Sequence, residues 1–146
     1  ELNLFESLCG KSAVDLRRVV DPHLPDITAN KSQIRQVISN LMVNALQAMP
    51  EGGILTLRTS FDASRVYLRV DDTGFGMSDE IKESIFLPFF TTKDIDQGTG
   101  LGLSVVHGIV SSHGGEIHVE SEKGKGTRFC VSFPRRLKRA SKEELF

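Results

Sequence analysis

The sequence predicts a two-layer α/β (α+β) sandwich, in which helices cover one face of a mixed, mostly antiparallel sheet. Two observations indicate this class. Segments with apolar residues at helical spacing alternate with pairs of short segments in which apolar and polar residues alternate. The chain has 146 residues, of which 39% are hydrophobic and 25% charged, and this composition suits one globular domain with a real core.

The first half of the chain contains a predicted strand, a long helix and a hairpin. Residues 14–20 alternate and lead into the turn sequence DPHLPD. The sequence NKSQ, residues 30–33, resembles a capping box and begins a helix that reaches about Met49. Its apolar residues form one stripe, which consists of Ile34, Val37, Ile38, Leu41, Ala45, Ala48 and Met49. Residues 54–61 and 65–72 then alternate like the two strands of a hairpin around the turn DAS.

The second half contains a short helix, a second long helix and a second hairpin. In SDEIKESIF, residues 78–86, the serine is a good N-cap for a short helix. Residues 101–113 form the second long helix, which is apolar on most sides and is therefore expected to be buried. Residues 114–121 and 126–133 end the pattern as two strands joined by the turn EKGKG.

Composition and charge argue against several functions. The formal net charge is −1, so the chain has no overall basic field that would attract nucleic acid or an anionic membrane. Cys9 and Cys130 have no metal-ligand spacing and are expected to be reduced thiols in a cytosolic protein. The sequence shows no secretory signal and no apolar run of membrane-spanning length. We expect a cytoplasmic domain with no nucleic acid and no direct membrane contact, whose parent protein can still be membrane-anchored.

Three glycines at alternate positions, Gly98, Gly100 and Gly102, lie where the second long helix begins. Without side chains, the backbone amides of such a loop can approach a ligand closely, and a helix N-terminus suits a phosphate. The pattern is not a Walker A motif, because no Gly-Lys-Ser/Thr follows, and no strand precedes it as in a dinucleotide fingerprint. Taken alone, it also fits a flexible loop that caps a core helix.

Two further motifs contain residues suited to nucleotide chemistry. Asn40 and Asn44, in NLMVNALQAM, are one helical turn apart, and an amide can ligate Mg²⁺ through its oxygen or donate to a phosphate. In DDTGFGM, Asp72 ends a strand and can accept from a base amino group, while Gly74 and Gly76 leave backbone bare for a flat ring. The alternatives are two polar residues at a helix boundary and an ordinary β-turn.

Two weaker signals follow in the chain. The three phenylalanines of IFLPFFTTK, residues 85–93, are read most simply as core or loop-anchoring residues. Lys93 could meet phosphate oxygens, although a loop lysine is usually solvated. Thr127, at the start of the last strand, could bond a base edge or a water, although an exposed strand threonine is the default expectation.

These motifs follow one another within one domain, and the series closely resembles the catalytic ATP-binding domain of sensor histidine kinases, in the superfamily that includes gyrase, Hsp90 and MutL. The matching motifs are the N box NLMVNALQAM, the first glycine box DDTGFGM, the F box FLPFFTTK and the second glycine box GTGLGLS. NALQAM with PFFTTK is most similar to the nitrogen-regulatory type. The resemblance implies a Bergerat-type ATP-binding fold over residues 14–134, between a linker or short helix (1–13) and a basic tail (135–146).

The resemblance also implies a role for each matching residue. Asn44 would ligate Mg²⁺, while Asn40 and Lys93 would hold phosphates, and these three residues form the expected catalytic group. Asp72 would accept a hydrogen bond from the adenine amino group of ATP, partly through a water shared with Thr127. The other residues implied to line the nucleotide are Gln47, Ala48, Gly74, Gly76, Met77, Gly98, Thr99, Gly100, Leu101, Gly102 and Leu103. Residues 86–99 would form a mobile lid. The chain departs from many sensor kinases at Gln47 and Ala48, where those proteins have a Lys-Tyr pair.

The type of reaction depends on Asn40. The gyrase, Hsp90 and MutL proteins have a glutamate general base at the corresponding position, whereas an amide cannot take a proton. The sequence therefore favours transfer of the γ-phosphate over hydrolysis. The chain's histidines, none of which lies in the acidic motif of the family's acceptor, are His23, His107, His113 and His118. Each is read as structural.

The phosphoacceptor is therefore expected outside this sequence. The chain begins without methionine, which is typical of a fragment. We expect the acceptor histidine in an upstream helical-hairpin dimerisation domain, with a response regulator as the indirect partner and a monomeric isolated fragment. The alternative function is a nucleotide-binding regulatory module without transfer activity.

Overall fold

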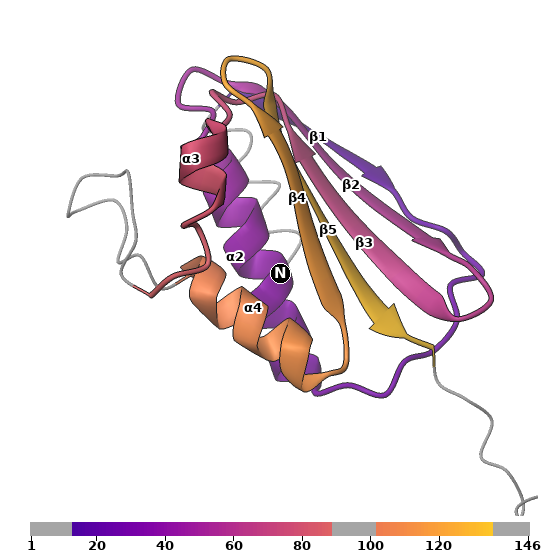
Figure 1. Ribbon diagram of the computed structural model, residues 1–146. Helices are drawn as coiled ribbons and strands as arrows, with labels where there is room; N and C mark the ends of the chain where they lie inside the picture. Colours follow the sequence, from indigo (N-terminus) through magenta and orange to yellow (C-terminus); the bar gives the residue numbers. More distant parts are fainter. Residues whose placement is uncertain (1–12, 89–101, 136–146) are drawn as a thin grey trace, which may run out of the picture.

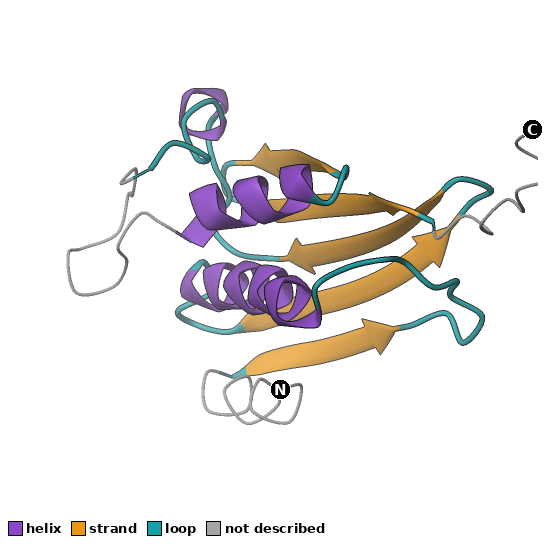
Figure 2. Ribbon diagram, turned by 90° about the horizontal axis from the view of Figure 1, so that it is seen from below, coloured by secondary structure: helices purple, strands orange, loops and turns teal. Residues whose placement is uncertain are grey.

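The computed structural model describes residues 13–88 and 102–135. Within these ranges five strands form one sheet in the order β1-β2-β3-β5-β4, and helices cover one of its faces (Figures 1 and 2). The strands are β1 (Val14–Val19), β2 (Gly53–Phe61), β3 (Arg65–Asp72), β4 (Glu116–Glu122) and β5 (Gly126–Pro134). β1 pairs with β2 in parallel, and the other three pairings are antiparallel. The predicted two-layer sandwich is therefore confirmed.

Three described helices form the second layer, namely α2 (Lys31–Gln47), α3 (Asp79–Lys82) and α4 (Gly102–Ser112). α2 and α4 lie side by side on the sheet, and the short α3 lies beside β4. None of the helices in the described ranges is long and apolar enough to cross a membrane. The predicted N-terminal linker and basic tail lie outside the described residues, apart from residue 13 and residue 135.

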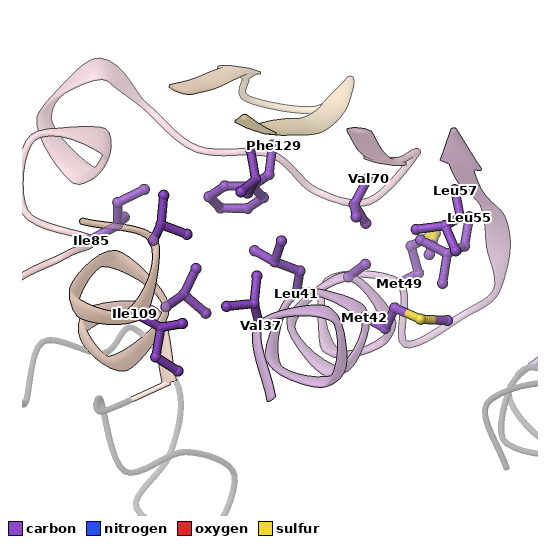
Figure 3. Packing of buried hydrophobic residues seen from close by; sticks show 14 of the residues in the cluster. Val37, Leu41, Met42, Met49, Leu55, Leu57, Val70, Ile85, Ile109 and Phe129 are labelled. Carbon is purple, nitrogen blue, oxygen red and sulfur yellow. The ribbon is translucent and has the colours of Figure 1, made fainter. Parts of the chain in front are cut away.

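The core lies between the sheet and the two long helices, α2 and α4 (Figure 3). Val37 and Leu41 of α2 and Val70 and Phe129 of the sheet are all buried. Val37 and Leu41 are one helical turn apart, so they belong to the apolar stripe that the sequence predicts. Full burial of a side chain of this size contributes about 1.5–3 kcal/mol, so packing is a main source of the stability of α2.

The N-terminus of α2 combines a local cap with a long-range contact. The side chain of Asn30 accepts a hydrogen bond from the backbone N–H of Gln33 at 3.1 Å, as the capping sequence predicts. The backbone N–H of Asn30 donates to Nε2 of His113 at 3.1 Å, where a capping box would use the side chain of residue 33. Nδ1 of His113 donates to the carbonyl of Ile109 at 2.8 Å. His113 therefore joins the start of α2 to the end of α4, which is the structural role expected of it.

The second long helix, α4, is expected to be buried because it is apolar on most sides, and this prediction is wrong for one of its faces. Val106, Ile109 and Val110 are buried, whereas His107 and Ser111 are exposed. In a two-layer sandwich a helix packs one face against the sheet and its neighbour, so its other face remains accessible even where the sequence is apolar. The position of α4 in the fold, rather than its composition, sets its burial.

The short helix after the first glycine box also differs from prediction. Ser78 caps α3 by accepting from the backbone N–H of Ile81 at 3.3 Å, but α3 ends at Lys82 instead of reaching residue 86. The chain continues in turns with bonds between residues three apart, such as Leu87 N–H to the carbonyl of Ser84 at 3.0 Å. In these turns Ile85 enters the core. Pro88 follows three residues later and disfavours helical conformation in the residue before it.

Candidate functional site

Asp72 and Thr127 are direct cross-strand partners, where β3 ends and β5 begins. Their exposed fractions are 7% and 6%. The carboxylate of Asp72 accepts from the backbone N–H of Gly74 at 2.8 Å. Burial raises the pKa of Asp72 to about 6, and this rise is opposed by the backbone N–H groups of Gly74 and Thr127. A buried carboxylate that is largely ionised at neutral pH therefore lies beside a buried hydroxyl.

The burial of Thr127 contradicts the default expectation of an exposed strand threonine. Side chains alternate across a strand, and Phe129, Val131 and Phe133 of β5 all enter the core. Thr127 continues this series on the helix-covered face. The alternation of the segment GTRFCVSF puts Thr127 on this face, and that pattern was the available signal for its burial.

The first glycine box is held closely between α2 and the β4–β5 turn. The backbone N–H of Phe75 donates to the carbonyl of Ala48 at 3.1 Å, and the N–H of Gly124 donates to the carbonyl of Phe75 at 2.7 Å. A Cβ atom at Gly74 would collide with the carbonyl oxygen of Ala48. Gly76 has φ +67, in the left-handed region that favours glycine. Both glycines are therefore required by the backbone, one for space and one for conformation.

Ser121, which sequence reasoning missed, connects this loop to Thr127. Its hydroxyl oxygen lies 2.8 Å from the backbone N of Met77, 3.0 Å from the carbonyl of Gly126 and 2.8 Å from Oγ1 of Thr127. Ser121 is the cross-strand partner of Thr127. The alternation of the segment EIHVES puts this serine on the same face as the apolar residues, and that pattern was the available signal.

Asn40 of α2 lies beside the start of α4. Nδ2 of Asn40 donates to the carbonyl of Gly102 at 3.4 Å. Asn44, one turn further along, is half-buried, and Gln47 at the last position of α2 is exposed. Leu103 packs against the core. The structure thus brings Asn40 and Gly102 together, from two motifs that are far apart in the sequence.

Several predicted site residues lie outside the described residues. These are Lys93, Gly98, Thr99, Gly100 and Leu101, together with Phe89 and Phe90 of the F box. Of the predicted lid, residues 86–88 are described. The ring of Phe86 packs against that of His107, with 5.3 Å between the centroids.

The described residues contain no group of three or more histidine, cysteine, aspartate or glutamate side chains that could hold a metal ion. An amide oxygen such as that of Asn44 can still serve as one ligand of Mg²⁺, which usually keeps several waters and binds substrate phosphates. The donor set present in the described part of the chain therefore fits a metal that arrives with a phosphate ligand, and not a metal held by the protein alone.

The fold and the motifs are those of the protein family that the sequence predicts. Residues 29–137 match the family described as histidine kinase-, DNA gyrase B- and HSP90-like ATPase, and the chain belongs to this family. The predicted family membership is therefore confirmed.

Within this family, sensor histidine kinases are among the similar proteins. Sensor kinase CckA of Brucella abortus is 44% identical over 90% of this chain, and sporulation kinase A of Bacillus subtilis is 36% identical over 91% of it. This chain covers only 15% and 22% of those two proteins. The solved catalytic domain of histidine kinase ThkA, in a nucleotide-free form, has a TM-score of 0.80 at 35% identity and covers 91% of this chain and 88% of that one. The chain is thus homologous to the catalytic domains of sensor histidine kinases.

Proposed function

We propose that this domain binds Mg-ATP and donates the γ-phosphate to a histidine on a separate helical-hairpin domain, as part of two-component signal transduction. The observation that supports this most strongly is the buried pair of Asp72 and Thr127 beside the bare backbone of Gly74. Homology to sensor histidine kinases supports the same function. A full-length relative, ShkA, has been solved in complex with AMPPNP, with a TM-score of 0.79 at 29% identity.

The carboxylate of Asp72 would accept a hydrogen bond from the amino group of adenine. The ionised carboxylate is the stronger acceptor, and a pKa of about 6 leaves Asp72 largely ionised at neutral pH. Its burial strengthens the electrostatic part of such a bond, because little water competes for the carboxylate. Gly74, Gly76 and Met77 would line the base, together with Ala48, whose carbonyl already holds this loop.

The amides of α2 would act at the phosphate end. Asn44 would offer its oxygen to Mg²⁺, and Asn40 would support the phosphates near the start of α4. When bound, Mg²⁺ neutralises phosphate charge. Neither asparagine can act as a general base, so attack by water is not promoted and the phosphoryl group is kept for another nucleophile. Lys93 of the F box and the backbone amides of residues 98–103 in the second glycine box are the proposed phosphate contacts.

Nucleotide binding is tested by calorimetric titration of the chain with a non-hydrolysable ATP analogue, first with Mg²⁺ and then with excess EDTA. We expect binding that weakens sharply when the metal is removed. Asn44→Ala should abolish most of this metal dependence, whereas Gln36→Ala, an exposed amide on the same helix, should preserve it. Equal binding with and without Mg²⁺ would contradict the assignment of Asn44.

Phosphoryl transfer is tested separately, by adding the upstream hairpin domain of the parent protein and measuring phosphohistidine on it. We expect transfer to the hairpin and little phosphorylation of the isolated domain, which we propose is monomeric. Nucleotide binding without any transfer would favour the alternative, a regulatory nucleotide-binding module. Rapid turnover of ATP without an acceptor would instead indicate a hydrolase.

A further inference from the structure

The hydroxyl of Ser121 contacts three polar atoms, and these contacts together determine which hydroxyl donates in the bond between Ser121 and Thr127. It lies near the end of β4 and is half-buried. Its oxygen is within 3.0 Å of the backbone N of Met77, the carbonyl of Gly126 and the hydroxyl of Thr127. A serine hydroxyl has one proton to donate and two lone pairs to accept with, so it can satisfy all three contacts in only one arrangement.

That arrangement follows from the two backbone partners. The N–H of Met77 is only a donor, so Ser121 accepts from it. The carbonyl of Gly126 is only an acceptor, so the single proton of Ser121 is donated there. The contact with Thr127 can then form only if the hydroxyl of Thr127 donates to the second lone pair of Ser121. Thr127 has thereby used its proton and presents lone pairs alone to its other neighbours.

We propose that Ser121 is a positioning residue that makes Thr127 a hydrogen-bond acceptor beside Asp72 and thereby selects adenine over guanine nucleotides. This inference rests on the proposed function. The carboxylate of Asp72 and the oxygen of Thr127 form a pair of acceptors on neighbouring strands, which matches the two N–H donors of an exocyclic amino group. Guanine has a carbonyl at the same ring position. Its oxygen would face the lone pairs of Asp72 and Thr127, so none of these three acceptors would receive a hydrogen bond there.

A bridging water would not change this selection. If a water donates both of its protons to Asp72 and Thr127, its own lone pairs face the base and accept from the amino group. If Thr127 were free to rotate, its proton could instead point toward the base and favour a carbonyl. The proton of Thr127 is therefore the feature that Ser121 controls.

The test compares three nucleoside triphosphates on the wild-type chain and on Ser121→Ala, by calorimetry with Mg²⁺. The ligands are ATP, GTP and purine riboside triphosphate, which lacks the 6-amino group. We expect Ser121→Ala to weaken ATP binding roughly three- to tenfold, the effect of one neutral hydrogen bond. Binding of the analogue without the amino group should change by a smaller factor, and the preference for ATP over GTP should narrow.

A purely structural role for Ser121 would give a different result. Loss of the bond to Met77 distorts the loop for every ligand alike, so all three affinities would fall by the same factor. Ser132→Ala is the matched control, because Ser132 is buried on β5 and accepts from Nε of Arg65 at 3.1 Å, away from Asp72. It should leave all three affinities unchanged.

Two more variants keep the test decisive if Ser121→Ala does not fold. Ser121→Thr retains the hydroxyl and should retain the preference for ATP. Ser121→Cys keeps the size of the side chain but provides only a weak donor and acceptor, so it should narrow the preference. An unchanged ratio of ATP to GTP affinity in Ser121→Ala or Ser121→Cys would overturn the inference while leaving the proposed function intact. Failure of the wild-type chain to bind any of the three ligands would remove the proposed function itself.

Discussion

Two aspartates at the two ends of β3 show how differently the same side chain is used in this fold. Asp62, in the turn before β3, is exposed and accepts from the backbone N–H groups of Ser64 and Arg65 at 2.9 and 2.8 Å and from the hydroxyl of Tyr67 at 2.6 Å. These bonds, that from Tyr67 first, lower the pKa of Asp62 to about 2. Asp72, at the other end of the strand, is buried, and its pKa is raised to about 6.

The difference separates a structural carboxylate from a candidate functional one. Asp62 uses its acceptor capacity within its own turn, so its ionised form stabilises the fold. The carboxylate of Asp72 is shielded from water and accepts from two backbone N–H groups, those of Gly74 and Thr127. A carboxylate has about four acceptor sites, so these two donors replace only part of its hydration. Its ionised form therefore costs stability in the free protein, and perturbed groups of this kind cluster at functional sites.

The largest expected effect is on stability and its pH dependence. The pKa of Asp72 is higher in the folded chain than its ordinary value of 3.8. The free energy of unfolding of the wild type therefore decreases as pH rises from about 4 through 6, because the buried group ionises. Asp72→Asn removes this loss and should raise the free energy of unfolding at pH 8 by up to about 3 kcal/mol. Urea denaturation between pH 4 and pH 8 measures the effect.

Asp62→Asn serves as the opposite control. The pKa of Asp62 is lowered, so its contribution is present above about pH 4 and is lost as pH falls toward 2. The variant should therefore be less stable than wild type at pH 8. If the two variants shifted stability in the same direction at pH 8, the contrast between the two carboxylates would be wrong.

The second effect concerns the loop that follows Asp72. Gly74→Ala would force a methyl group into the carbonyl of Ala48, and overpacking of this kind costs about 1–3 kcal/mol. Gly108→Ala in α4 is the matched control, since a Cβ there meets nothing within 4 Å and the substitution should stabilise the helix by about 0.5–1 kcal/mol. Thermal unfolding of both variants gives the comparison, and equal melting temperatures would show that the space at Gly74 is not restricted.

The third and smallest effect is the pH dependence of nucleotide affinity. Because protonation weakens Asp72 as a hydrogen-bond acceptor, affinity should fall by up to about tenfold between pH 7 and pH 5, as a group of pKa about 6 takes up its proton. The same titration on Asp72→Asn corrects for protonation of the phosphates. A wild-type profile that parallels that of Asp72→Asn would exclude Asp72 as the titrating group.

Local patterns were sufficient to predict the elements of this fold. The bounds of β3 follow from the alternation of RVYLRVDD, and the N-cap at Asn30 follows from its own sequence. The apolar stripe of α2 predicted which residues face the sheet, among them Val37 and Leu41. These features depend on neighbours in the chain, so one sequence contains the information needed.

The finer structure of the site could not be predicted in the same way. Asp62 and Asp72 both resemble turn formers in the sequence, and the motif DDTGFGM favours Asp72 as a site residue without revealing that its side chain is buried. The contacts of Ser121 depend on how β4 pairs with β5, and the bond from Asn30 to His113 joins residues 83 positions apart. Long-range geometry of this kind leaves no periodic trace in the sequence.

We propose that Asp72 recognises the adenine of a bound nucleotide, whereas Asp62 only stabilises a turn. The most direct test is a calorimetric titration of wild type, Asp72→Ala and Asp62→Ala with an ATP analogue and Mg²⁺ at neutral pH. We expect Asp72→Ala to lose about 1–3 kcal/mol of binding free energy, or roughly one to two decades in affinity, and Asp62→Ala to bind like wild type. Wild-type affinity in Asp72→Ala would exclude Asp72 as the residue that recognises adenine.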